Sequence, residues 1–81
     1  MVQEFDGKYD LVVDAVNLKC PEPVMLLHKG IRSIESGQVL KIIATDPSTT
    51  RDIPSFCNHL NHELISQCTA DERYIYILRK K

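Results

Sequence analysis

The 81-residue sequence lacks an excess of charge of either sign. Ten Lys and Arg residues against eleven Asp and Glu residues leave a formal net charge of -1. Proteins that bind a phosphate backbone usually carry a strongly positive balance. The chain also has no Trp, and it offers little beyond Tyr74 and Tyr76 as a platform for stacking bases. We therefore expect no direct nucleic-acid partner.

Long apolar runs are also missing from the sequence. None approaches the roughly 18 residues that a membrane-spanning helix needs. Residues 1–7, MVQEFDG, show neither the basic segment nor the apolar segment of a secretory signal. We expect a cytoplasmic protein without membrane contact, and a length of 81 residues predicts a single domain.

Cysteines are few, and their spacing fits no disulfide framework. The three residues Cys20, Cys57 and Cys68 are odd in number, so we expect free thiols. No C-x-x-C pair is present, which excludes a thioredoxin-type dithiol and a zinc site built on such a pair. His59 and His62, together with Cys57, form only a weak metal pattern, so we expect no metal site.

Alternating or β-branched segments predict four strands, at residues 9–15, 38–45, 63–69 and 74–79. A first helix is expected from the C-P-E-P segment to the stop at Ser36-Gly37, with an apolar stripe of Val24, Leu27, Ile31 and Ile34. A second helix follows residues 46–52, with Pro54 expected in its first turn and a stripe of Ile53, Phe56, Cys57 and Leu60. The order βαβαββ predicts an α/β (α+β) two-layer sandwich, with both helices on one face of a four-stranded mixed sheet.

A thiol stands directly before the proline-rich start of the first helix. Pro21 and Pro23 cost little there, because the first N–H groups of a helix have no intrahelical partner. Cys20 is then expected at the N-cap or just outside it. The helix dipole and Lys19 favour the thiolate while Glu22 opposes it, so we expect a moderately lowered pKa for Cys20. The alternative is that Cys20 is only a small core residue.

The first helix also predicts an outward face beside this thiol. If the apolar stripe meets the sheet, Met25 and Leu26 turn away from the core centre, close to Cys20. Glu22, Met25, Lys29 and Arg32 would share that face. Exposed apolar residues beside a reactive thiol favour docking of a protein, although an ordinary solvated helix face is the alternative.

Other polar residues are interpreted as structural. His28 lies roughly 12 Å along the first helix from Cys20, too far to act as its base. Cys57 is expected in the core, and Cys68 is given no role. Thr49, Thr50 and Asp52 are better explained as helix caps than as catalysts.

Two motifs together resemble a known family. The C-P-E-P segment at Cys20 and the segment D-P-S-T-T-R-D-I-P-S-F-C before the second helix, with H-E-L at residues 62–64, resemble the TusA family of sulfur carrier proteins, also called SirA-like. The resemblance spans residues 14–80. Asn17 stands where the family commonly has Gly, and Lys19 replaces a frequent Arg.

The resemblance implies a two-layer α/β sandwich that carries sulfur as a persulfide on the C-P-x-P cysteine, here Cys20. The donor would be a cysteine desulfurase, whose pyridoxal phosphate does the carbon–sulfur cleavage, so this chain needs no cofactor. The acceptor would be a TusBCD-type relay complex that serves 2-thiolation of tRNA wobble uridine. Relatives are linked to molybdenum-cofactor synthesis or sulfur oxidation, so these alternatives remain.

Docking geometry would control such a transfer, and a monomer is expected because Cys20 must meet successive partners. The candidate docking contacts are Met25, Leu26, Lys29, Arg32, Asp46 and Arg51. A non-enzymatic RNA-binding or adaptor module is a rival interpretation that the near-neutral charge disfavours. A peroxide-sensing thiol is another, but it would need a resolving cysteine near Cys20.

Overall fold

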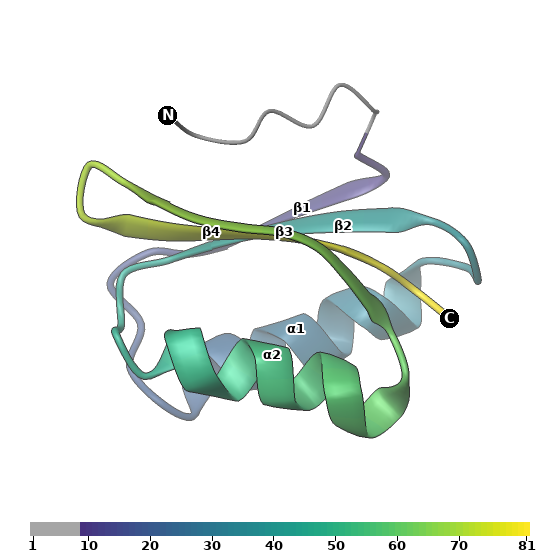
Figure 1. The fold of residues 1–81 in the computed structure, drawn as a ribbon, viewed down its shortest axis with the longest axis horizontal. Coiled ribbons are helices and arrows are strands. Elements are labelled where there is room, and N and C mark those ends of the chain that lie inside the picture. Colours follow the sequence, from purple (N-terminus) through teal and green to yellow (C-terminus); the bar gives the residue numbers. More distant parts are fainter. Residues whose placement is uncertain (1–8) are drawn as a thin grey trace.

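The computed structural model describes residues 9–81, which form a sheet covered on one face by two helices (Figure 1). The elements, in chain order, are β1 (Leu11–Ala15), α1 (Glu22–Ser33), β2 (Val39–Ala44), α2 (Thr49–Leu60), β3 (Glu63–Ala70) and β4 (Arg73–Arg79). The predicted order βαβαββ is confirmed. Among the described residues, no helix is long and apolar enough to cross a membrane.

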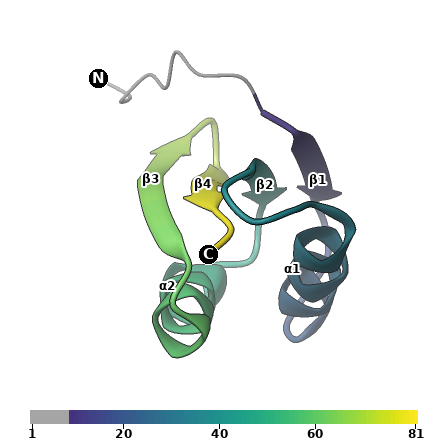
Figure 2. The ribbon, with the colours of Figure 1, turned by 90° about the vertical axis from the view of Figure 1, so that its right-hand side faces the viewer.

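The four strands form one mixed sheet in the order β1-β2-β4-β3. β1 runs parallel to β2, whereas β4 pairs antiparallel with both β2 and β3. A turn at Asp71 and Glu72 joins β3 to β4, and both residues have positive φ, as short hairpin turns with the right-handed strand twist require. Figure 2 shows both helices on the same side of the sheet, which confirms the predicted two-layer sandwich.

The core lies between the sheet and the two helices. Leu27 and Ile31 of α1 and Ile53 and Phe56 of α2 meet the buried residues of the two central strands, among them Leu40, Ile42, Tyr76 and Leu78. Tyr76 keeps its polar end satisfied, because its hydroxyl lies 2.9 Å from Thr49 Oγ1. Each helix therefore has one face fixed to the sheet, and its first turn is held at one sheet edge.

Helix α1 ends earlier than the sequence pattern predicts. It stops at Ser33, and Ile34 is already extended, with φ −114° and ψ 169°. Ile34 is nonetheless buried, so the apolar stripe continues past the helix. Gly37 does not cap the helix; it lies in the following turn with φ +86°, a conformation that glycine adopts without strain.

Helix α2 begins earlier than the sequence pattern predicts. It starts at Thr49, so Pro54 lies in its second turn, and the prediction of a first-turn proline is wrong. Pro54 removes the N–H that would bond the carbonyl of Thr50, a residue on the exposed start of the helix. The helix stops at Leu60, where Asn61 adopts φ +61°, so His59 and His62 do not share a helix.

Candidate functional site

Cys20 lies where two connections meet at one edge of the sheet. The parallel pairing of β1 and β2 places both carboxyl ends side by side, so the segments leading into α1 and α2 are neighbours. The backbone N–H of Cys20 donates to Asp46 Oδ2 at 2.7 Å, and that of Asn17 donates to Thr45 Oγ1 at 2.9 Å. Cys20 itself is exposed, directly before the N-cap residue Pro21, as predicted.

Asp46 is the residue that ties these two connections together. Its carboxylate accepts hydrogen bonds from the backbone N–H and the hydroxyl of Ser48, at 3.1 and 2.9 Å, besides the one from Cys20. The bond from the Cys20 backbone does most to hold the pKa of Asp46 below its usual value, and the bonds from Ser48 and the charge of Lys19 add to it. Asp46 therefore fixes the backbone of the thiol-bearing residue.

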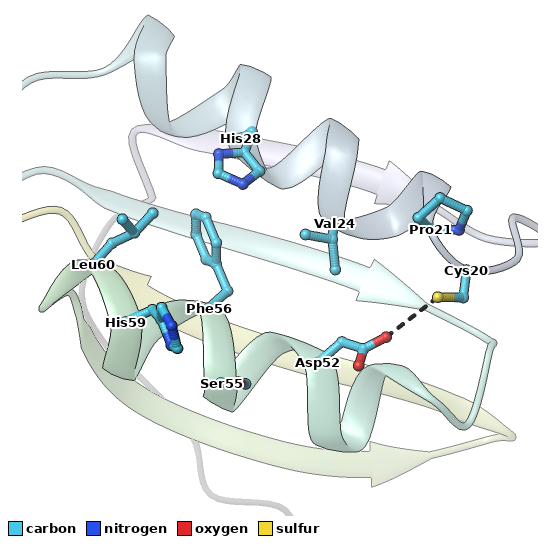
Figure 3. A pocket seen from close by; sticks show the side chains of 9 residues that line it. All are labelled: Cys20, Pro21, Val24, His28, Asp52, Ser55, Phe56, His59 and Leu60. Carbon is cyan, nitrogen blue, oxygen red and sulfur yellow. Dashed lines mark hydrogen bonds between the residues drawn. The ribbon is translucent and has the colours of Figure 1, made fainter.

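The side chain of Asp52 is hydrogen-bonded to the Cys20 thiol. From the sequence alone, only a capping role was predicted for this residue. Cys20 Sγ donates to Asp52 Oδ2 at 3.5 Å (Figure 3). The other carboxylate oxygen lies 3.5 Å from Arg51 Nε, and the Asp52 side chain is 24% exposed. The parallel pairing of β1 and β2 would have predicted this contact, because it brings the first turns of α1 and α2 together.

The expected lowering of the Cys20 pKa is wrong. The hydrogen bond to Asp52 raises the pKa above that of an ordinary thiol, and desolvation and the charges of Asp52 and Asp46 raise it further. Only the Ser48 hydroxyl opposes them. The carboxylates of Asp52 and Asp46, which the sequence analysis did not place near the thiol, therefore account for much of the rise.

An open groove of about 490 Å³ runs from Cys20 between the two helices. Figure 3 shows its lining, which comes from both helices: Cys20, Pro21, Val24, His28, Asp52, Ser55, Phe56, His59 and Leu60. The His28 ring packs edge-on against Phe56, with ring centroids 4.6 Å apart. His28 thus belongs structurally to the groove wall, in keeping with the structural role predicted for it.

The candidate docking residues on α1 separate into two kinds. Met25 is 61% exposed, and Glu22, Lys29 and Arg32 are exposed as well, so the outward face exists as predicted. Leu26 does not belong to it, because its side chain is half-buried and packs against the core.

The two docking candidates outside α1 also differ. The Arg51 side chain is 81% exposed. The carboxylate of Asp46 is already bound within the chain by Cys20 and Ser48. A docking role for any of these residues remains a prediction.

The remaining thiols and polar groups have structural surroundings. Cys57 is buried, which raises the pKa of its thiol to about 11, and Cys68 is half-buried. Thr49 and Thr50 donate their hydroxyls to the carbonyls of Asp46 and Pro47, in the turn that opens α2.

His62 lies beyond the end of α2. Its ring packs against Phe56, and its Nδ1 accepts the backbone N–H of Lys81. No metal-sized cluster of three His, Cys, Asp or Glu residues occurs within residues 9–81.

Comparison with known proteins places this geometry in a family. The family model described as "Sulfurtransferase TusA" matches residues 11–80. The chain belongs to the TusA family. It is a sulfur carrier, and a role in sulfur transfer implies partners in a sulfur relay.

Relatives in the family are similar over nearly their whole length. The sulfur carrier protein TusA of Pseudomonas putida (strain W619) is 56% identical over 72 residues, which cover 89% of this chain and 90% of the relative. That of Pseudomonas aeruginosa (strain LESB58) is 54% identical over 72 residues, covering 89% and 91%. The crystal structure of a SirA-like protein from Desulfitobacterium hafniense has a TM-score of 0.76 and 14% identity, covering 85% of this chain and 95% of its own, so it supports the fold alone.

Proposed function

We propose that Cys20 accepts a sulfane sulfur from the persulfide of a cysteine desulfurase and passes it to an acceptor thiol of a TusBCD-type relay complex, for 2-thiolation of tRNA wobble uridine. The observation that carries this proposal is the position of Cys20: an exposed thiol on a backbone fixed by Asp46, opening onto the groove between the helices. The other two thiols are half-buried or buried.

The chemistry needs only thiol–persulfide exchange. The Cys20 thiolate attacks the outer sulfur of the donor persulfide, so a bond forms between Sγ and that sulfur while the donor's S–S bond breaks. The donor thiolate leaves with the electron pair and takes up a proton. In delivery, an acceptor thiolate attacks the same outer sulfur, and Cys20 leaves as the thiolate. No net oxidation occurs, and neither step requires a cofactor on this chain.

Both partners would approach the edge where Cys20 lies. The exposed face of α1, with Met25, Lys29 and Arg32, stands beside the groove, and the exposed Arg51 contacts Asp52, which lines the groove from α2. Apolar groove walls next to exposed cations suit docking of a protein surface. We propose that the chain works as a cytoplasmic monomer, because a dimer covering this edge would block both transfers.

The destination of the sulfur is tested in a bacterium that lacks its own family member and is complemented with this chain. We expect 2-thiouridine to return in the tRNAs for Lys, Glu and Gln with the wild type and with Cys68→Ser, but not with Cys20→Ser. Nucleoside mass spectrometry measures it. If the wild type restores molybdoenzyme activity or sulfur oxidation instead of the nucleoside, the acceptor assignment is wrong, and direct binding of tRNA would support an RNA-binding module.

A further inference from the structure

In the contact between Cys20 and Asp52, the thiol is the donor and the carboxylate is the acceptor. An aspartate carboxylate has no proton to give, so the hydrogen bond at 3.5 Å is one in which Sγ–H donates and Oδ2 accepts. A thiolate in the same place would face a like charge at the same distance. The second oxygen of the carboxylate lies 3.5 Å from Arg51 Nε, and the Asp52 side chain is 24% exposed.

Among the other groups near the sulfur, Asp46 also favours the neutral thiol, whereas Ser48 favours the thiolate. Asp46, from the connection between β2 and α2, is the second carboxylate facing Cys20, and its own charge is partly balanced by Lys19. The hydroxyl of Ser48, just before α2, lowers the pKa of Cys20, but it also donates to Asp46 Oδ2 at 2.9 Å. The thiol is therefore hydrogen-bonded to one carboxylate and feels the charge of a second, in a family whose function is to carry sulfur.

We propose that Asp52 is a positioning residue that holds the sulfur of the empty Cys20 as a neutral, hydrogen-bonded thiol and, in the loaded carrier, slows the escape of the bound sulfane sulfur to stray thiols. The inference rests on the proposed function of Cys20 and adds a residue that controls how long the sulfur stays.

Retention follows from the release step. When a thiolate attacks the outer sulfur, the bond between that sulfur and Sγ breaks, and the electron pair remains on Sγ. Cys20 is thus the leaving group, and a thiol that ionises less readily leaves more slowly. The Asp52 carboxylate opposes the charge that develops on Sγ until a proton arrives and the hydrogen bond re-forms. The same carboxylate slows delivery to the acceptor, which breaks the same bond, and it lowers the thiolate fraction of the empty carrier. Retention is therefore gained at some cost in the rates of loading and delivery.

The test compares Asp52→Asn with the wild type. The amide keeps the shape of the side chain and an oxygen that accepts from Sγ–H, but it removes the charge. Glu35→Gln is the control, because it removes the same charge from an exposed residue past the opposite end of α1. Asp52→Glu keeps the charge and should stay closer to the wild type than Asp52→Asn does.

Two readouts are measured. Empty proteins are alkylated with iodoacetamide across a pH series, and proteins loaded with inorganic polysulfide are exposed to 2-mercaptoethanol, with the modified cysteine located by peptide mass. In Asp52→Asn we expect the midpoint of the alkylation curve to move to lower pH. A tenfold larger thiolate fraction should raise the alkylation rate only about threefold, because a more acidic thiolate is a weaker nucleophile. Sulfur loss from Cys20 should be at least about twofold faster than in the wild type or Glu35→Gln.

An unchanged or higher alkylation midpoint in Asp52→Asn would overturn the proposal, as would sulfur loss at the wild-type rate. Equal behaviour of the Asn and Glu variants would also overturn it, since charge would then not matter. Circular dichroism establishes that each variant is folded. Because polysulfide loads the thiol without a donor enzyme, failure of the proposed function would appear separately, as a wild-type chain that a cysteine desulfurase does not load.

Discussion

The backbone N–H of Cys20 and the carboxylate of Asp46 are joined by a 2.7 Å hydrogen bond, although 26 residues separate them along the chain. The same carboxylate holds Ser48 at the start of α2. One side chain therefore sets the position of the thiol relative to both helices.

Replacing Asp46 by Ala should lower the melting temperature and slow sulfur loading of Cys20, because the backbone that carries the thiol loses its anchor. Asp46→Asn, which keeps an acceptor of the same shape, should lie between Ala and the wild type. The stabilisation by Asp46 is complete above the ordinary pKa of about 3.8 and is lost as pH falls through its lowered folded-state pKa. In urea unfolding at a series of acid pH values, the free energy of unfolding should therefore fall less steeply with falling pH in Asp46→Ala than in the wild type. Equal slopes would contradict the anchoring role of Asp46.

On the outward face of α1, Met25→Glu or Arg32→Glu should slow transfer from a cysteine desulfurase without unfolding the protein, because both side chains are exposed. Transfer is measured as the rate of Cys20 persulfide formation by intact mass. Val12→Glu is the control: Val12 is 53% exposed and alternates with Val13, which packs on the core, so it lies on the sheet face away from the helices. Transfer at the wild-type rate in both α1 variants would show that the donor docks elsewhere.

Gly30 marks the closest approach of α1 to the sheet. A Cβ there would lie 2.8 Å from Leu40 Cδ1 and 3.0 Å from Val13 Cγ2. Overpacking of this kind costs about 1–3 kcal/mol, against about 0.8–1.0 kcal/mol that Ala gains over Gly in a helix. We expect Gly30→Ala to lower the free energy of unfolding in urea, while Lys29→Ala, on the exposed side, changes it by less than about 0.5 kcal/mol. A more stable Gly30→Ala would mean that the helix is free to shift.

Burial of Cys57 predicts a loss of stability in alkali. Its pKa is raised to about 11 in the folded chain, from 9.0 for an ordinary thiol. The unfolded chain therefore releases this proton first, and stability falls as pH rises from about 9 to about 11. Cys57→Ala should show a shallower fall over this range, measured as the free energy of unfolding in urea. Tyr76, whose pKa is also raised, is present in both proteins, so the difference isolates Cys57.

Local patterns predicted most of this fold, because they depend on neighbours in sequence. The proline-rich start of α1 follows from the missing donors of a first helical turn, and the hairpin follows from strand periodicity. Leu26 was placed wrongly because Pro23 and Gly30 were not counted as core positions, yet they share its face and are buried. The role of Asp52 could not be found locally, since its contact with Cys20 spans 32 residues and depends on β1 pairing with β2.

The central claim, that Cys20 carries the sulfur, is tested most directly by intact-mass analysis after incubation with a cysteine desulfurase and cysteine. We predict a gain of sulfur atoms that a reducing agent removes, that persists in Cys68→Ser and that is lost in Cys20→Ser. Full sulfur gain by Cys20→Ser, with the modification located on Cys68, would contradict the account.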